Sequence, residues 1–139
     1  MRGAEPVYKG GCLCGALRWE ASAPPRFAGF CFCADCRRSS GSGFIPFMGF
    51  AAEHIRFSGE ARQIRSPAIT GGEAVRNRCA ACGSLVYGGE VGRDAEHTVY
   101  AGSLDDPSLF EPQVAIFVRD KPDWVSIPAG VAPFETMPG

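Results

Sequence analysis

The sequence predicts a mainly β fold of about eight to ten short strands with minor helical turns. Glycine (18 residues) and proline (11) are spread through the 139 residues and leave little room for long helices. The segments between them are short and rich in Val, Ile, Phe, Tyr and Trp, which favour strands. We expect a single domain over residues 1–139, with a core over about 8–127 and a loosely ordered tail over 128–139.

The expected strands follow one another along the chain. Residues 17–20 alternate between apolar and polar, the period-two pattern of a half-buried strand. Residues 44–50 form a continuous apolar run, in which Pro46 favours an edge strand or a bulge over a central strand. Alternation returns at residues 54–57 and continues at Ile64. Later strands are expected over residues 84–87, 98–100, 114–118 and 124–127.

One short helix is expected from Asp35 or Cys36 to Ser40, ending before Gly41. Its first turn would follow directly on a C-x-x-C motif, and a helix N-terminus favours the thiolate form of a nearby cysteine. Residues 104–107 are expected to form a loop.

The seven cysteines are arranged as C-x-C, C-x-C-x-x-C and C-x-x-C. They are Cys12, Cys14, Cys31, Cys33, Cys36, Cys79 and Cys82. An odd number argues against a complete set of disulfides, and residues two apart are poorly placed to pair with each other. In a strand, however, residues i and i+2 point to the same face, so both sulfurs can bind one metal ion. Gly15 and Gly83 follow two of the motifs and permit positive φ there.

Three partitions of these cysteines compete. In the first, the outer four form a closed site and the central three, within residues 31–36, form an open one. In the second, the central cluster joins one outer pair; in the third, one metal binds and the other cysteines are core thiols. We favour the first, because the central three lie close in sequence and each outer pair precedes a glycine. His54 and His97 lie away from the cluster, and Asp35 is expected to be a helix N-terminal residue rather than a ligand.

Four motifs make the chain resemble the glutathione-dependent formaldehyde-activating enzyme family. They are Gly10-Gly11-Cys12-Leu13-Cys14-Gly15-Ala16-Leu17-Arg18-Trp19, Cys31-Phe32-Cys33-Ala34-Asp35-Cys36-Arg37-Arg38, Cys79-Ala80-Ala81-Cys82-Gly83-Ser84 and Gly102-Ser103-Leu104-Asp105-Asp106-Pro107. The resemblance implies the Mss4-like fold, in which zinc staples β-sheets of short antiparallel strands. It implies two zinc ions per chain: a structural one on Cys12, Cys14, Cys79 and Cys82, and a catalytic one on Cys31, Cys33 and Cys36.

The resemblance also implies an activity: the condensation of formaldehyde with glutathione to S-(hydroxymethyl)glutathione, classed as carbon–sulfur lyase chemistry. The chain departs from the family pattern at three positions. Phe32 and Ala115 stand where histidines are common, and Arg78 stands where phenylalanine is common. None of these changes removes a zinc ligand, but the missing histidines remove proton shuttles.

An open three-thiolate zinc site suits a fourth thiolate supplied by a small molecule such as glutathione. Zinc would hold that sulfur beside an electrophile such as an aldehyde, so that proximity contributes to the rate. Arg37 and Arg38 could pair with substrate carboxylates, although surface positions suit them better. Phe44, Phe47 and Phe50 could line a pocket, although core packing suits at least two of them better.

Two other functions remain open at this stage: a non-catalytic zinc-binding module that engages another protein, and a thiol-redox sensor. A formal net charge of −1 argues against nucleic-acid binding. No apolar run approaches the roughly 18 residues that span a bilayer, and residues 1–10 show no secretory signal. We therefore expect a cytoplasmic enzyme, with no membrane partner and an oligomeric state that the sequence does not reveal.

Overall fold

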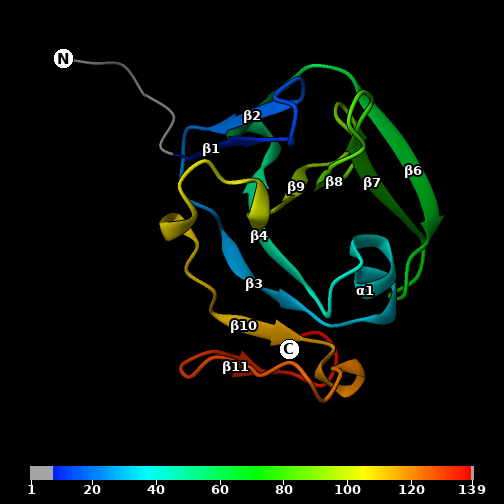
Figure 1. The fold of residues 1–139 in the computed structure, drawn as a ribbon, viewed down its shortest axis with the longest axis vertical. Coiled ribbons are helices and arrows are strands. Elements are labelled where there is room, and N and C mark those ends of the chain that lie inside the picture. The colour runs from blue at the N-terminus through cyan, green and yellow to red at the C-terminus, as the bar shows by residue number, and fades with distance from the viewer. Residues whose placement is uncertain (1–7, 139) are drawn as a thin grey trace.

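The computed structural model describes residues 8–138 of the chain (Figure 1). Within these residues, eleven strands form two sheets, accompanied by one α-helix and four short 3-10 helices. The expected mainly β fold is therefore confirmed.

The smaller sheet is antiparallel and has the order β1-β2-β5. Its strands are β1 (Tyr8–Gly11), β2 (Arg18–Ala21) and β5 (Ile55–Ser58). The Trp19 side chain of β2 donates a hydrogen bond to the Ser103 hydroxyl at 2.9 Å. Gly10 allows the close approach of this region, because a Cβ there would lie 2.2 Å from the Ser103 carbonyl oxygen. These contacts attach the smaller sheet to the segment that follows β9.

The larger sheet has the order β11-β10-β3-β4-β9-β8-β7-β6. Its strands are β3 (Phe27–Cys31), β4 (Ile45–Ala51), β6 (Ala61–Pro67), β7 (Glu73–Cys79), β8 (Leu85–Gly88), β9 (Glu96–Tyr100), β10 (Val114–Ile116) and β11 (Ala132–Pro133). Neighbouring strands are antiparallel, except that β10 runs parallel to both β3 and β11.

The two faces of the larger sheet have different roles. Met48 and Val99 are register partners on one face, and both are fully buried. They belong to the main core with Phe50 and with Trp19 of the smaller sheet. The next residues along the strands point the other way. Phe47 and Tyr100, also register partners, therefore lie on the opposite face, which lines a cleft described below.

The helix α1 (Ala34–Ser40) lies on the concave side of the curved larger sheet (Figure 1). Cys33 is its N-cap residue, and Gly41 ends it with a φ of 75°. The sequence predicted this helix to within two residues at its start and correctly at its end. The four 3-10 helices are η1 (Ala52–His54), η2 (Ala101–Ser103), η3 (Pro107–Leu109) and η4 (Val118–Asp120).

Two strand expectations are wrong. Pro46 lies in β4, a central strand rather than an edge strand. The sheet tolerates it because the pairing of β4 with β9 begins only at the next residue, Phe47. Residues 124–127 form a turn and irregular backbone instead of a strand. Val125 and Ile127 pack instead against a buried cluster of Phe32, Ala115 and Val131.

The segment expected to be a loose tail, residues 128–139, is described up to residue 138, and backbone hydrogen bonds order much of that part; residue 139 lies outside the described residues. Within residues 128–138, β11 pairs with β10, and Val131 is buried. The Phe117 N–H donates to the Thr136 carbonyl oxygen at 3.1 Å. The described part of the chain contains no helix long and apolar enough to cross a membrane.

Candidate metal centres and adjoining cleft

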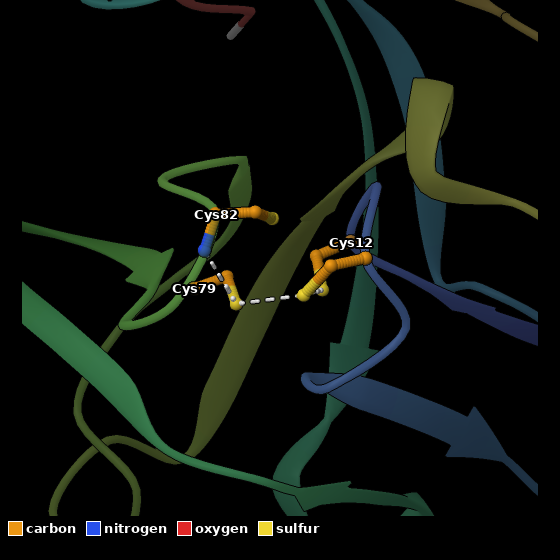
Figure 2. Close-up of side chains that lie close together, drawn as sticks. Cys12, Cys79 and Cys82 are labelled. Carbon is orange, nitrogen blue, oxygen red and sulfur yellow. Dashed lines mark hydrogen bonds between the residues drawn. The ribbon is translucent and has the colours of Figure 1, made fainter.

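Two turns from different sheets bring four cysteines together. Cys12 and Cys14 lie in the turn between β1 and β2, while Cys79 ends β7 and Cys82 follows it. All four sulfurs lie within 4.8 Å of one another. Figure 2 shows Cys12 facing Cys79 and Cys82 across the gap between the turns. This is the outer set of four predicted from the sequence.

The spacing of these sulfurs fits the tetrahedral coordination of a metal ion. A Zn–S distance of about 2.3 Å gives sulfur–sulfur edges of about 3.8 Å in a regular tetrahedron. The Cys12 and Cys14 sulfurs are 3.7 Å apart, and those of Cys14 and Cys79 are 3.8 Å apart. The four cysteines could therefore hold one metal ion.

Backbone N–H groups around the cluster favour thiolates. The Leu17 N–H donates to the Cys12 sulfur at 3.2 Å, and the Cys82 N–H donates to the Cys79 sulfur at 3.4 Å. Both turns depend on glycine, since Gly15 and Gly83 have φ angles of 84° and 78°. This confirms the positive φ expected at the two glycines. A hydrogen bond from the Ser84 hydroxyl lowers the pKa of the Cys82 thiol to about 5.

The other three cysteines form a second cluster. Cys31 ends β3, Cys33 caps α1, and Cys36 lies in the first turn of that helix. Their sulfurs also lie within 4.8 Å of one another. Cys31 and Cys33 are buried, whereas Cys36 is partly exposed. No histidine or carboxylate of residues 8–138 joins either cluster, so this one provides three ligand atoms.

The three central thiols cannot all ionise easily without a cation. The hydrogen bond from the Cys31 thiol lowers the pKa of Cys33. In turn, the hydrogen bond with Cys33 raises the pKa of Cys31, and the hydrogen bond with Cys31 raises the pKa of Cys36. A divalent ion would remove this opposition by neutralising adjacent thiolates. The donor set therefore fits a metal that prefers sulfur.

A cleft of about 820 Å³ opens beside the second cluster. Cys31 and Cys36 line it, whereas none of the four cysteines of the first cluster does. Its volume falls within the range of small-molecule sites. The two clusters thus differ in surroundings as well as in ligand number. The four-cysteine cluster lies between two turns, and the three-cysteine cluster faces a cavity.

One face of the larger sheet forms much of the wall of the cleft. Residues opposite each other in register share a face, and so do residues two apart along a strand. The pairs Phe47–Tyr100, Gly88–Thr98 and Arg76–Gly88 connect this face from β4 to β7. Toward β10, the pair Cys31–Ile116 continues it. The cleft therefore extends from the three-cysteine cluster across the sheet.

The structure separates the residues that the sequence singled out. Phe47 lines the cleft, but Phe44 packs against Phe30 and Phe32, and Phe50 lies in the main core. Core packing of at least two of the three is thus confirmed. Arg37 and Arg38 are not among the residues that line the cleft. His97 is buried, with its Nδ1 3.0 Å from the Gly88 carbonyl oxygen, and His54 is exposed.

The two positions where histidines were missing lie on the far side of the sheet from the cleft. Phe32 and Ala115 are buried together in the cluster that contains Val131. Ala115 lies between Val114 and Ile116, which both line the cleft, and so points to the opposite face. The apolar residues at these two positions therefore fill a second core and do not face the cleft.

Two residues of the cleft were missed in the sequence. Arg76 was not among the residues singled out, and Tyr100 was expected only as the end of a strand. The signal for Arg76 was its place in a period-two pattern with Val75 and Asn77, which are both buried. The Arg76 side chain therefore points away from the main core. No local pattern could show that Tyr100 lies across the sheet from Arg76.

The comparisons with known proteins agree with this geometry. Residues 7–120 match the family described as "Glutathione-dependent formaldehyde-activating enzyme". The chain belongs to the glutathione-dependent formaldehyde-activating enzyme family. A Halomonas elongata protein named "Putative glutathione-dependent formaldehyde-activating enzyme" is 28% identical over 127 residues, which are 87% of this chain and 81% of that protein.

A crystal structure of a Rhodobacter sphaeroides protein has a related fold. It superposes with a TM-score of 0.55 at 23% identity, covering 75% of this chain and 96% of that one. The family match includes all seven cysteines, so both clusters lie within the segment that this family shares.

Proposed function

We propose that this chain is a zinc-dependent carbon–sulfur lyase that forms and cleaves thiol–aldehyde adducts, similar to S-(hydroxymethyl)glutathione synthase. In this proposal, Cys12, Cys14, Cys79 and Cys82 bind a structural zinc ion. Cys31, Cys33 and Cys36 bind a catalytic zinc ion, and the whole chain forms one domain. The observation that carries the proposal is that only the three-cysteine cluster lines the cleft.

Zinc at the open cluster would hold the sulfur of an incoming thiol and lower its pKa, so that a thiolate is present at neutral pH. In the forward reaction, the sulfur lone pair forms a bond to the carbonyl carbon of an aldehyde. The carbonyl π electrons move to the oxygen, which takes up the proton released by the thiol. The reverse reaction breaks the carbon–sulfur bond and returns the thiol and the aldehyde.

Residues of the chain would hold the metal ligands in place, donate a hydrogen bond to the ligand and exclude water from the reacting groups. Cys31 and Cys33 are buried, so their sulfurs are held by the packing of β3 and α1. Burial raises the pKa of the Tyr100 phenol. Tyr100 therefore stays protonated at neutral pH and can donate a hydrogen bond to the oxygen of a ligand in the cleft. The apolar cleft walls formed by Phe27, Phe47 and Ile116 exclude water from the reacting groups.

All seven cysteines are free, which fits a reducing compartment such as the cytoplasm. Glutathione, named in the family description, is the first thiol to test.

Cys36→Ala removes one ligand of the open cluster from the partly exposed first turn of α1. We expect this variant to fold, to keep the four-cysteine site and to lose its acceleration of adduct exchange between glutathione and formaldehyde. Exchange can be measured by NMR at equilibrium, with circular dichroism as the check on folding. Arg62→Gln is the control, because Arg62 is exposed on β6 and does not line the cleft, and it should exchange at the wild-type rate. Wild-type exchange in Cys36→Ala would overturn the proposal.

A further inference from the structure

The charges along the cleft are balanced at every charged residue but one. Glu73 pairs with Arg65, Arg93 with Asp94, and Glu96 with Arg26. Arg76 is the remaining charged residue of the wall. Among residues 8–138, no carboxylate lies within salt-bridge distance of it, and the Ser66 hydroxyl accepts its hydrogen bond at 3.2 Å. Arg76 is only partly exposed, so its guanidinium presents inside the cleft a positive charge that no carboxylate of the described residues neutralises.

The position of Arg76 sets where a bound anion would lie. Arg76 is on β7, while Cys31 is on β3, four strands away in the sheet. Arg76 and two of the cysteines, Cys31 and Cys36, line the same cleft from different elements, so one bound ligand can contact both. A ligand that reaches both must therefore carry an anionic group as well as a sulfur.

Tyr100 lies between these two ends. It is on β9, two strands from both β7 and β3. A Cβ on Gly88 would lie 3.2 Å from the Tyr100 hydroxyl oxygen, and Gly88 is the register partner of Arg76. Because Gly88 has no side chain, the Tyr100 hydroxyl has room next to Gly88, the register partner of Arg76.

The wall next to the three cysteines is apolar. Phe47, Ile116, Phe27 and Val114 pack in one cluster with the cysteines and also line the cleft. Formaldehyde has no carbon chain that could contact these side chains. An aldehyde with an alkyl or aryl group would bury that group here, and each buried methylene contributes to affinity.

We propose that the cleft binds adducts of a carboxylate-bearing thiol with an apolar aldehyde larger than formaldehyde. Arg76 binds the carboxylate, and the wall of Phe27, Phe47, Val114 and Ile116 takes the carbon chain of the aldehyde. This inference rests on the proposed function, because it assigns the sulfur of the adduct to the three-cysteine cluster. It adds the specificity-determining residues and the substrate class.

The test uses two stable thioethers, S-methylglutathione and S-hexylglutathione, titrated into the purified protein by calorimetry. Neither can undergo the reaction, so binding is measured apart from turnover. The longer chain adds five methylenes, and partial burial of these should make S-hexylglutathione bind about 10- to 100-fold more tightly. Equal binding of the two thioethers would overturn the assignment of the apolar wall.

Substitutions separate the two parts of the cleft. Arg76→Gln should weaken both thioethers about tenfold or more, because it removes the charge that pairs with the carboxylate. Arg62→Gln is the matched control, since Arg62 is exposed on the neighbouring strand β6 and does not line the cleft. Phe27→Ala, or the nearly isosteric Val114→Thr if Phe27→Ala fails to fold, should reduce the preference for the hexyl compound, measured as the ratio of the two dissociation constants; an unchanged ratio would overturn the assignment of the apolar wall. Unchanged binding in Arg76→Gln would overturn the carboxylate assignment.

Turnover measurements keep this inference distinct from the proposed function. Tight, Arg76-dependent binding of S-hexylglutathione without any adduct exchange would overturn the proposed reaction and support the binding site. Adduct exchange with formaldehyde, together with equal binding of the two thioethers, would support the reaction and overturn the apolar substrate class.

Discussion

At the scale of single residues, Gly49 determines how closely the cleft wall can pack. Gly49 and Phe27 are register partners in β4 and β3, and the Phe27 ring covers the glycine. A Cβ at Gly49 would lie 2.0 Å from the Phe27 ring. A methyl group there would therefore push Phe27 into the space that we assign to the aldehyde chain.

Gly49→Ala is expected to lower the free energy of unfolding by about 1–3 kcal/mol, the usual range for overpacking. Urea denaturation at neutral pH measures this. Gly102→Ala is the matched control, because Gly102 is exposed and a Cβ there meets nothing within 4 Å, so its change should stay within about 0.5 kcal/mol. Wild-type stability in Gly49→Ala would show that Phe27 can move aside freely.

Phe117 is the one residue other than glycine in the described chain with a positive φ, at 56°. It is buried in the same cluster as Cys31 and Cys33. A left-handed conformation costs a bulky residue about 1–3 kcal/mol. Its packing against the cysteines and its hydrogen bond to Thr136 offset that cost, so the C-terminal segment helps to hold the site.

At the scale of elements, Arg78 of β7 connects the surroundings of the two cysteine clusters. Its guanidinium donates to the Ser39 carbonyl oxygen near the end of α1 and to the Gly83 carbonyl oxygen at 2.9 Å. α1 carries Cys36, and Gly83 follows Cys82. The arginine that departs from the family pattern thus ties the helix of one cluster to the turn of the other.

Arg78→Gln should loosen α1, because hydrogen bonds from a charged group contribute about 1.5–3 kcal/mol when buried and less when partly exposed. We expect amide hydrogen exchange over residues 36–41 to become roughly tenfold faster, a change of about 1.4 kcal/mol. Its register partner Arg62 is exposed, so Arg62→Gln serves as the control. Unchanged exchange in α1 would mean that packing alone holds the helix.

Strands with regular alternation were predictable, whereas β7, which has an asparagine at a buried position, was not. Residues 17–20 and 54–57 correspond closely to β2 and β5. β7 was missed, because Asn77 occupies a core position in its alternation. The Asn77 amide is satisfied by the carbonyl oxygens of Tyr87 and Gly89, at 3.2 and 2.8 Å, which sequence patterning cannot show.

At the scale of the whole molecule, the four-cysteine cluster joins the two sheets. It connects the β1–β2 turn of the smaller sheet to the β7–β8 turn of the larger one. A metal there would close a loop of more than 60 residues between Cys14 and Cys79, and cross-links across long loops most strongly restrict the unfolded chain.

The grouping of the cysteines was predictable, whereas the cleft was not. Ligands that converge within a few residues or within one turn leave a signal in the sequence spacing. The cleft combines side chains from β10, β3, β4, β9, β8 and β7, so its composition depends on strand order and register. Those follow from long-range pairing, which carries no comparable local pattern.

The central claim is that the chain holds one closed and one open zinc site. Elemental analysis of zinc per chain, on the wild type and on Cys36→Ala, tests it most directly. We predict two zinc ions in the wild type and one in a folded Cys36→Ala, because only the three-cysteine site loses a ligand. The same zinc content in both proteins would contradict the account, since Cys36 would then not help to hold a metal ion beside the cleft.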